Sequence, residues 1–299
     1  MPVLGTSGIT LPTNIASGLW SKATTGSAVA QLSGQQPMQF GNVTYMTFTA
    51  PPRAEYVAEA AQKGTSGGTF GTKVATPHKA HVTMRFNEEV QWAEDDYQIG
   101  VLNTLADAGA VALARALDLG VFHGFNPLTG TAIASIVAGD RINTTTNRTE
   151  VTTAAAADTE FETAAGLLIN NGYVPNGVAI DPKFAWTLST ARYSDGRKKF
   201  PELGLGTEIS NFSGLNASVS STVSGVPEAT DTKLRAMLGD WTALRWGVQK
   251  QIPVETIRYG DPDGQGDLKR QNQIALRLEI VYGWAVMDLN AFSAMNDLV

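Results

Sequence analysis

The chain has 299 residues, enough to bury a substantial core as one large domain or two smaller ones. Hydrophobic residues make up 43% of it, which excludes disorder, and charged residues only 17%, against roughly 25% in typical soluble domains, so much of the surface need not face water. The formal net charge of −6 argues against a domain that clamps a nucleic-acid backbone, because such binding depends on clustered Lys and Arg side chains.

Neither a disulfide framework nor a targeting segment is expected. The chain contains no cysteine, which excludes disulfides and thiolate metal sites. The amino terminus lacks a basic region followed by an apolar run, so it does not read as a secretory signal. No window approaches the roughly 18 consecutive apolar residues of a membrane-spanning helix. We therefore expect a soluble protein that is made inside a cell and has no membrane partner.

Residues 1–38 predict an extended arm that lies over another surface. They are rich in Gly, Ser, Thr, Pro and Gln, and such a segment cannot build a core of its own. Its isolated apolar anchors are Leu4, Ile9, Leu19, Trp20, Val29 and Leu32. A strand is expected next at residues 42–48, and Pro51-Pro52 ends it.

The stretch KGTSGGTFGTK, residues 63–73, is predicted to be the tip of a long β-hairpin. Residues 54–59 lead into it, and residues 80–90 lead out of it with apolar and polar residues alternating. A phosphate-binding loop is excluded, because no glycine of the stretch precedes a lysine and a strand follows it instead of a helix. A projecting two-stranded hairpin is only marginally stable in water, so we expect it to lie on another surface. The residues assigned to this assembly tip are Lys63, Gly64, Gly67, Gly68, Gly71 and Lys73.

Residues 94–124 are predicted to form the longest helix of the chain. Glu94, Asp95 and Asp96 suit the amino terminus of a helix, where carboxylates are favourable. Apolar and small residues then recur at helical spacing, which favours close packing on one face.

A short α/β unit is expected in the middle of the chain, after a loop or short strands at residues 130–157. Asp158 is predicted to cap a helix that ends near Asn171-Gly172. A buried strand at residues 178–180 then leads to Asp181-Pro182, a capping residue followed by proline in the first turn.

The last third of the chain is predicted to consist mainly of strands. In the final one, residues at every second position are apolar from Ile274 to Val286, which is the strongest periodicity of the protein. The expected strands are residues 217–223, 234–241, 244–248 and 272–286.

No catalytic, cofactor-binding or metal-binding residue is assigned. Of the histidines His78, His81 and His123, the first two point to opposite faces of a strand and are expected to be solvated. The loop at residues 261–267 superficially resembles a calcium loop, but Asn272 stands where a bidentate glutamate is required, so an exposed turn is expected. The cations of residues 192–199 are expected in a solvated loop, with an anion site as the alternative. An enzyme is not predicted.

The order of these elements resembles that of the major capsid protein of tailed bacteriophages, the Hong Kong 97 fold family. The similar stretches correspond to the family's extended loop, its exit strand, the end of its spine helix, its axial domain with a buried tryptophan, here Trp186, and the return into its peripheral domain. In that order they are EYVAEAAQKGTSGGTFGTK, FNEEVQWAEDD, LDLGVFHGFNPLTG, NGVAIDPKFAWTLSTARYSDGR and WTALRWGVQKQIPVETIRYGD.

The resemblance implies an α+β, Hong Kong 97-type capsid fold with a defined succession of parts. These are an N-terminal arm (1–45), an extended hairpin loop with flanking strands (46–90), a spine helix with the start of the peripheral domain (91–150), an axial domain (151–245) and return strands of the peripheral domain (246–299).

The resemblance also implies a structural function rather than an enzymatic one. The subunit would self-assemble as hexamers and pentamers into the icosahedral shell that encloses viral double-stranded DNA, with the hairpin reaching over an adjacent subunit. Its partners would be further copies of itself, separate scaffold, portal and decoration proteins, and packaged DNA by non-specific contact. The expected location is the virion capsid, assembled in the cytoplasm of a host bacterium, and no cofactor is expected.

Some members of that family lock the shell with a lysine–asparagine bond helped by a glutamate. By position, the candidates here would be Lys63, Asn272 and Glu279, with solvated polar groups as the alternative reading. Two alternative functions stay open: the shell protein of an encapsulin-type nanocompartment, and an unidentified soluble α+β enzyme. A tail or adhesin module is disfavoured, because the long helix at residues 94–124 does not fit an array of short strands.

Overall fold

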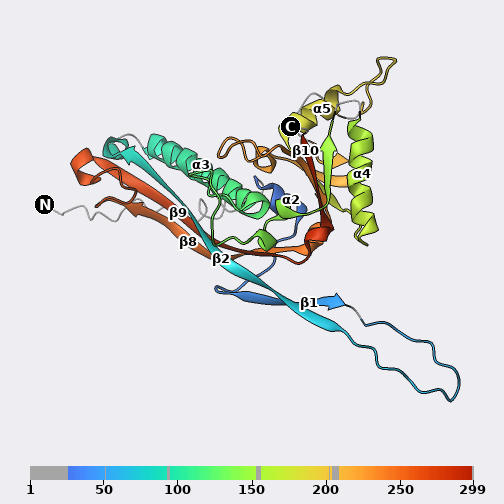
Figure 1. Cartoon of the computed structure of the whole chain (residues 1–299). Coiled ribbons are helices and arrows are strands. Elements are labelled where there is room, and N and C mark those ends of the chain that lie inside the picture. Colours follow the sequence, from blue (N-terminus) through green and yellow to red (C-terminus); the bar gives the residue numbers. More distant parts are fainter. Residues whose placement is uncertain are drawn as a thin grey trace.

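The computed structural model describes residues 26–50, 52–92, 95–152, 156–201, 203 and 209–297. These residues form two β-sheets, one long helix beside the first sheet and two shorter helices beside the second (Figure 1). The α-helices of this described part are α2 (Ala28–Leu32), α3 (Asp95–His123), α4 (Ala157–Asn170) and α5 (Pro182–Thr190). No helix in this described part of the chain is both long and apolar enough to span a membrane.

The first sheet has four antiparallel strands, and α3 covers one of its faces. In sheet order the strands are β1 (Val43–Ala50), β2 (Thr69–Asn87), β9 (Gln273–Val286) and β8 (Leu244–Ile257). The alternation predicted for the last long strand is confirmed. All seven apolar residues at every second position of β9 are buried, and six of them, from Leu276 to Val286, belong to the core that α3 helps to build.

Two glycines let α3 lie close to this sheet. A Cβ atom at Gly120 would lie 2.8 Å from the ring of Trp284, and one at Gly109 would lie 3.1 Å from Leu278. The hydroxyl of Tyr282 donates a hydrogen bond of 3.1 Å to the backbone oxygen of Leu113. The small residues predicted for the helix therefore serve close helix–sheet packing. The helix has 29 residues, which gives a length of about 43 Å at roughly 1.5 Å per residue.

The second sheet has six strands and carries α4 and α5. In sheet order the strands are β3 (Arg148–Val151), β10 (Phe292–Asp297), β7 (Leu234–Gly239), β4 (Gly177–Ile180), β6 (Leu215–Val219) and β5 (Asn211–Phe212). Its core includes Phe161 and Leu168 from α4 and Phe184 and Leu188 from α5. As predicted, Asp181 caps α5: its carboxylate accepts a hydrogen bond of 2.8 Å from the amide of Lys183, and Pro182 begins the helix.

The prediction of a buried tryptophan in this region is wrong. Trp186 is 56% exposed, whereas Phe184 and Leu188 are buried. Residues four apart share one helix face, but the residue midway between them points away from it. Asp158 is also not the capping residue that we predicted. Helix α4 begins one residue earlier, and Lys199 approaches the Asp158 carboxylate to 2.9 Å.

The carboxyl-terminal strand β10 (Phe292–Asp297) lies within residues 246–299, which we assigned to the return strands. It does not pair with the other return strands, β8 and β9, in the first sheet. Strand β10 lies in the second sheet, parallel to β3 and antiparallel to β7. The reason is burial: Phe292, Ala294 and Met295 are fully enclosed there. The strand expected at residues 217–223 is shorter than predicted, because a 3-10 turn (η4, Ser221–Val223) follows β6.

The N-terminal arm was expected to be extended, but part of it forms the short helix α2. Leu4, Ile9, Leu19 and Trp20 lie outside the described residues. Further along, the Ser27 hydroxyl caps α2 by accepting a hydrogen bond from the amide of Ala30. Among the predicted apolar anchors, Val29 is fully buried and Leu32 packs against the same core. Figure 1 shows α2 enclosed between α3 and the second sheet.

Candidate assembly surface

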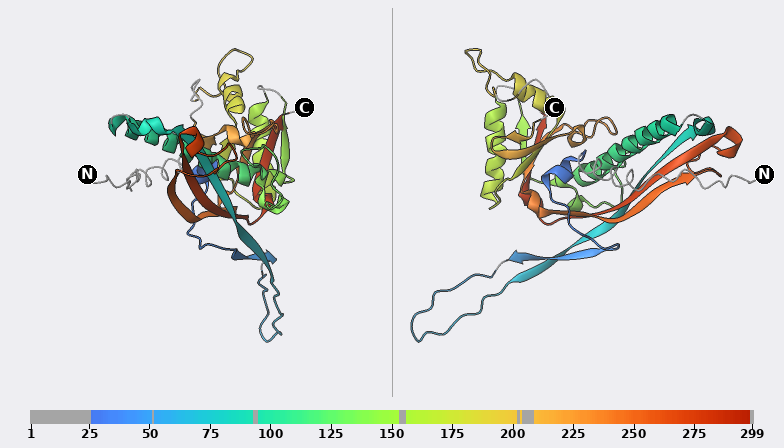
Figure 2. Two further views of the ribbon diagram at one scale, coloured as in Figure 1. Left: turned by 90° about the vertical axis from the view of Figure 1, so that its left-hand side faces the viewer. Right: turned by 180° about the vertical axis from the view of Figure 1, so that it is seen from behind.

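Strands β1 and β2 form the predicted long hairpin, which projects from the first sheet and away from the rest of the subunit (Figure 2). The pairing runs from Val43 opposite Ala75 to Phe48 opposite Phe70. From Thr76 onward, β2 leaves β1 and pairs with β9 instead. Because one strand of 19 residues serves both the hairpin and the sheet, the hairpin is a continuation of the sheet and not a separate module.

The turn of the hairpin lies earlier in the chain than we predicted. A hydrogen bond of 3.1 Å from the amide of Ala61 to the oxygen of Ala58 closes it, and Ala60 has a φ of 64°. Lys63, Gly64, Gly67 and Gly68 lie on the returning side of the exposed loop. Gly71 and Lys73 lie within β2, opposite Thr47 and Tyr45 of β1. The glycine-rich stretch is therefore partly loop and partly strand.

Two hydrogen bonds cross the loop. The amide of Gly64 donates to the carboxylate of Glu55 over 3.2 Å, and the amide of Arg53 donates to the hydroxyl of Ser66 over 2.9 Å. The described loop, residues 52–68, contributes no side chain to either hydrophobic core. Within a single subunit the loop therefore contributes little to the stability of the fold.

One face of the hairpin is apolar and exposed, and sequence reasoning missed it. Phe48 and Phe70 are opposite each other with ring centroids 4.7 Å apart, and each is 60% exposed. Met46, two residues before Phe48, is 72% exposed, and Val74 also lies on this face. Alternation around Met46 and Phe48 is the sequence signal that could have indicated it. We call these four residues the apolar hairpin face.

The three residues considered for a covalent crosslink do not meet within one subunit. Lys63 lies in the projecting loop, whereas Asn272 and Glu279 lie at the first sheet. Asn272 has a φ of 52° in the turn before β9 and is not part of that strand. The carboxylate of Glu279 is 2.9 Å from the ammonium group of Lys79. A bond from Lys63 to Asn272 would thus have to join two subunits.

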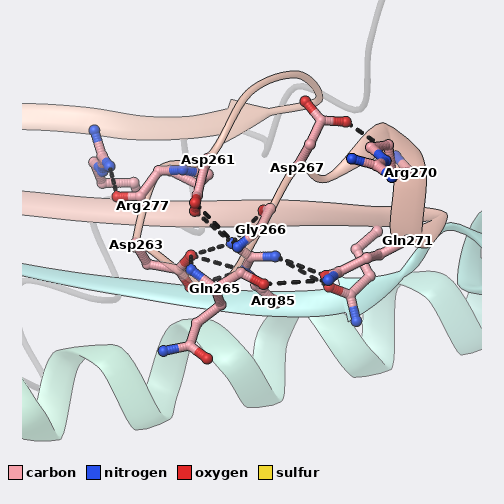
Figure 3. A network of polar contacts seen from close by, with 11 residues as sticks. Arg85, Asp261, Asp263, Gln265, Gly266, Asp267, Arg270, Gln271 and Arg277 are labelled. Atoms are coloured by element: carbon pink, nitrogen blue, oxygen red, sulfur yellow. Dashed lines mark hydrogen bonds and ion pairs between the residues drawn. The ribbon is translucent and has the colours of Figure 1, made fainter.

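The acidic loop between β8 and β9 holds a guanidinium group where a calcium loop would hold an ion (Figure 3). The Arg85 side chain donates to both carboxylate oxygens of Asp263 over 2.8 Å, to Asp261 over 3.0 Å and to the backbone oxygen of Gly266 over 2.9 Å. A further bond of 3.0 Å reaches Gln271. The hydrogen bond from Arg85 lowers the pKa of Asp263. The predicted exposed turn is therefore fastened to β2.

Within the described residues, the histidines and the cationic loop form no metal-binding cluster. His78 is half-buried on the ring of Trp284, 4.3 Å away between centroids, so our expectation of a solvated side chain was wrong for it; His81 is exposed. In the cationic loop, Arg197 pairs with Asp195 over 2.6 Å, which favours a solvated loop. Within the described residues, no group of three or more His, Cys, Asp or Glu side chains could hold a metal ion.

His123, at the end of α3, is buried and neutral. Its Nε2 atom donates to the backbone oxygen of Val223 over 2.8 Å, and its Nδ1 atom accepts from the side-chain amide of Asn143 over 3.1 Å. Burial lowers its pKa from 6.5 to about 4. Because a second proton on the ring would face the Asn143 amide, the folded state resists protonation here.

We expect His123 to make the subunit less stable in mild acid. The unfolded chain binds a proton near pH 6.5 and the folded chain only near pH 4, so this contribution is complete above pH 6.5 and is lost progressively as the pH falls toward 4. The expected loss is about 3 kcal/mol of unfolding free energy. Urea unfolding between pH 7 and pH 4 measures it, with His123→Gln as the control. An equal pH dependence of wild type and variant would contradict this assignment.

Comparisons with known proteins agree with this architecture. The model of the phage capsid family matches residues 7–297. A solved chain from Mycobacterium phage Ogopogo is 46% identical, with a TM-score of 0.82 over 91% of this chain and 92% of that chain. A chain from Gordonia phage Cozz is 32% identical, with a TM-score of 0.80 over 91% of this chain and 87% of that chain.

A more distant structure shares the fold alone. The capsid of an empty GTA particle computed with C5 symmetry is 14% identical, with a TM-score of 0.61 over 92% of this chain and 90% of that chain. A comparison with curated proteins finds no match. The family match and the two phage relatives cover nearly the whole described chain, and they favour a capsid over an encapsulin-type compartment. The chain therefore belongs to the phage capsid family, as a structural capsid protein with the Hong Kong 97-type α+β fold.

Proposed function

We propose that the chain is the major capsid protein that assembles as hexamers and pentamers into the icosahedral shell around viral double-stranded DNA. The observation that carries the assembly role is the apolar hairpin face, which is held far from both cores by strand pairing. Complete burial of one such side chain contributes about 1.5–3 kcal/mol. A neighbouring subunit that covers Met46, Phe48 and Phe70 would therefore gain a substantial part of an interface.

The proposal also covers the partners of the subunit and the cellular location in which the particle forms. With a net charge of −6, contact between the subunit and packaged DNA would be diffuse and non-specific. Separate scaffold, portal and decoration proteins would complete the particle, which would form in the cytoplasm of the host bacterium. We propose no catalytic role. The parts of the chain named for the resemblance, from N-terminal arm to axial domain, would be the units that meet their neighbours in the shell.

The crosslink from Lys63 to Asn272 stays a prediction. If it forms, the two residues come from neighbouring subunits, and Glu279 would have to leave Lys79 to assist. Denaturing electrophoresis of assembled particles tests it, because covalently linked subunits migrate as a ladder of multiples. A single band at the subunit mass would contradict the crosslink and leave the assembly proposal intact.

Replacing both hairpin phenylalanines by serine is expected to block assembly without unfolding the subunit. Phe48 and Phe70 are 60% exposed, so Phe48→Ser/Phe70→Ser removes few contacts within the chain but loses the apolar surface offered to a neighbour. Negative-stain electron microscopy with size-exclusion chromatography measures the result. The wild type should form closed shells or rings of five or six, and the variant should stay a folded monomer.

The matched control for this experiment is Phe48→Leu/Phe70→Leu. It keeps the face apolar and should still assemble, which separates loss of apolar surface from loss of the aromatic pair. Normal shells from the serine variant would overturn the role of this face. A wild-type chain that stays monomeric with every capsid partner supplied would overturn the proposed function itself.

A further inference from the structure

A carboxylate that is completely buried lies at the junction of three parts of the fold. Asp118 projects from α3 and is 0% exposed. Its Oδ1 atom accepts from the Ser27 hydroxyl over 2.5 Å and from the Val29 amide over 3.1 Å. Its Oδ2 atom accepts from the Ala28 amide over 3.0 Å and from the Thr222 hydroxyl over 2.8 Å. The carboxylate thus joins the spine helix to the N-terminal segment and to the turn η4, which follows β6 of the second sheet.

The geometry surrounds this carboxyl group with hydrogen-bond donors, while its complete burial raises its pKa. Two oxygens offer about four acceptor positions, and four donors fill them. A proton on either oxygen would oblige the hydroxyl beside it to accept a hydrogen bond instead of donating one. Two of the donors are backbone amides at the start of α2, which cannot reverse their role as hydroxyls can. The N-terminal segment is therefore held by a buried carboxyl group, and the nearby Arg115 is engaged in an ion pair with Glu228.

From this anchor the chain runs directly to the root of the hairpin. We call residues 26–42 the strap. The backbone oxygen of Ser33 accepts from the Trp246 indole over 2.9 Å, and the amide of Gln36 donates to the oxygen of Trp246 over 2.9 Å. The amide of Gly41 donates to the Gln249 side chain over 3.1 Å. The strap thus follows β8 and continues into β1 at Val43.

The backbone of the strap packs directly against the backbone of β8. A Cβ atom at Gly247 would lie 2.1 Å from the backbone oxygen of Gln36. A side chain at this position of β8 would push the strap away. The strap is therefore fixed at one end by Asp118, along its length by β8, and at the other end by the pairing of β1 with β2.

We propose that Asp118 is a positioning residue for assembly, which acts through the strap and touches no neighbouring subunit. By docking the strap it sets the direction in which β1 leaves the body, and so the direction of the apolar hairpin face. Thr222 lies beside the second sheet, so the same carboxylate links the hairpin root to the position of that sheet. The assembly part of this inference rests on the proposed function, and the docking part does not.

Asp118→Asn tests the anchor with almost no change in shape. Each carboxylate oxygen faces one backbone amide, so the new NH2 group meets a backbone N–H whichever way the side-chain amide is turned. Hydrogen exchange in the unassembled subunit is the first measurement. Amides of residues 28–36 should exchange roughly tenfold faster or more, because a buried donor loses its acceptor, while those of β9 stay protected.

Three further variants isolate the cause. Glu150→Gln makes the same carboxyl-to-amide change, but on an exposed strand position, and should leave exchange in the strap unchanged. Thr222→Val removes one donor and Thr222→Ser keeps it, so only the valine variant should raise exchange in the strap. If Asp118→Asn does not fold, the comparison of Thr222→Val with Thr222→Ser takes its place, because Ser27→Ala would also remove the cap of α2.

Assembly is measured on the same variants. Fast exchange in the strap together with lost or aberrant shells supports the proposal. Unchanged exchange overturns the anchor. Fast exchange with normal shells overturns the positioning role and leaves the proposed function standing. A wild type that never assembles removes the proposed function, while the exchange result still decides whether Asp118 docks the strap.

Discussion

Replacing residues 54–65 by a short Gly-Ser turn leaves the subunit folded and abolishes shell assembly. The loop between β1 and β2 is exposed, and its described residues contribute nothing to either hydrophobic core. Shortening such a loop should change the free energy of unfolding by less than about 1 kcal/mol. The hairpin, however, loses the reach it needs to cover a neighbouring subunit. Thermal unfolding checks the fold, and electron microscopy checks assembly.

The replacement must end before the paired part of the hairpin. Thr69 to Ala75 pair with β1, so a deletion that enters this range would shift the register and expose the wrong face. The control is a Gly-Ser loop of the native length, which keeps the reach but removes the loop's own side chains, among them the fully exposed Tyr56. Intact shells from the shortened variant would show that reach is not required.

Arg235→Ala is expected to have the largest effect on stability, about 3–5 kcal/mol. The Arg235 side chain is only 4% exposed and lies 2.9 Å from Asp231 and 2.5 Å from Asp297. A third carboxylate, Asp181, lies 3.9 Å away. Removing the guanidinium leaves these carboxylates close together without their buried cation. Urea unfolding at neutral pH measures the loss.

Lys183→Ala is the matched control for Arg235→Ala. The Lys183 ammonium also pairs with Asp231, over 2.8 Å, but its side chain is 63% exposed, so its removal should cost at most about 1 kcal/mol. Arg235 holds the pKa of Asp231 well below its usual range. The advantage of the wild type is therefore present above the unfolded pKa near 4 and is lost as the pH falls below it. Equal losses from the two variants would contradict the role of burial.

Local signals account for the parts of the fold that were predicted correctly. The alternation from Ile274 to Val286 places one face of β9 on α3, because side chains of a strand alternate between faces. The Asp181-Pro182 pair marks the start of α5, because both residues act within one helical turn. The long helix is confirmed within one residue at either end.

The candidate site was only partly predictable. A hairpin in this region follows from alternation and from the glycine-rich stretch, but the position of its turn at Ala58–Ala61 does not, since composition alone does not set the register. The register also decides that Phe48 meets Phe70 on one exposed face. Until the pairing is known, two phenylalanines 22 positions apart are indistinguishable from core residues.

By itself, the sequence determined the projecting hairpin and the spine helix, because each depends on patterns within a short window, and the order of such elements along the chain indicated the α+β class and the likeness to capsid proteins. Only the tertiary structure decided which distant groups meet. The Arg85 side chain occupies the acidic loop that resembles a calcium site, and β10 pairs within the second sheet. Asp118 accepts hydrogen bonds from residues 27–29 and from Thr222. These contacts join residues about 50 to 190 positions apart, and such pairs leave no mark in local periodicity or composition.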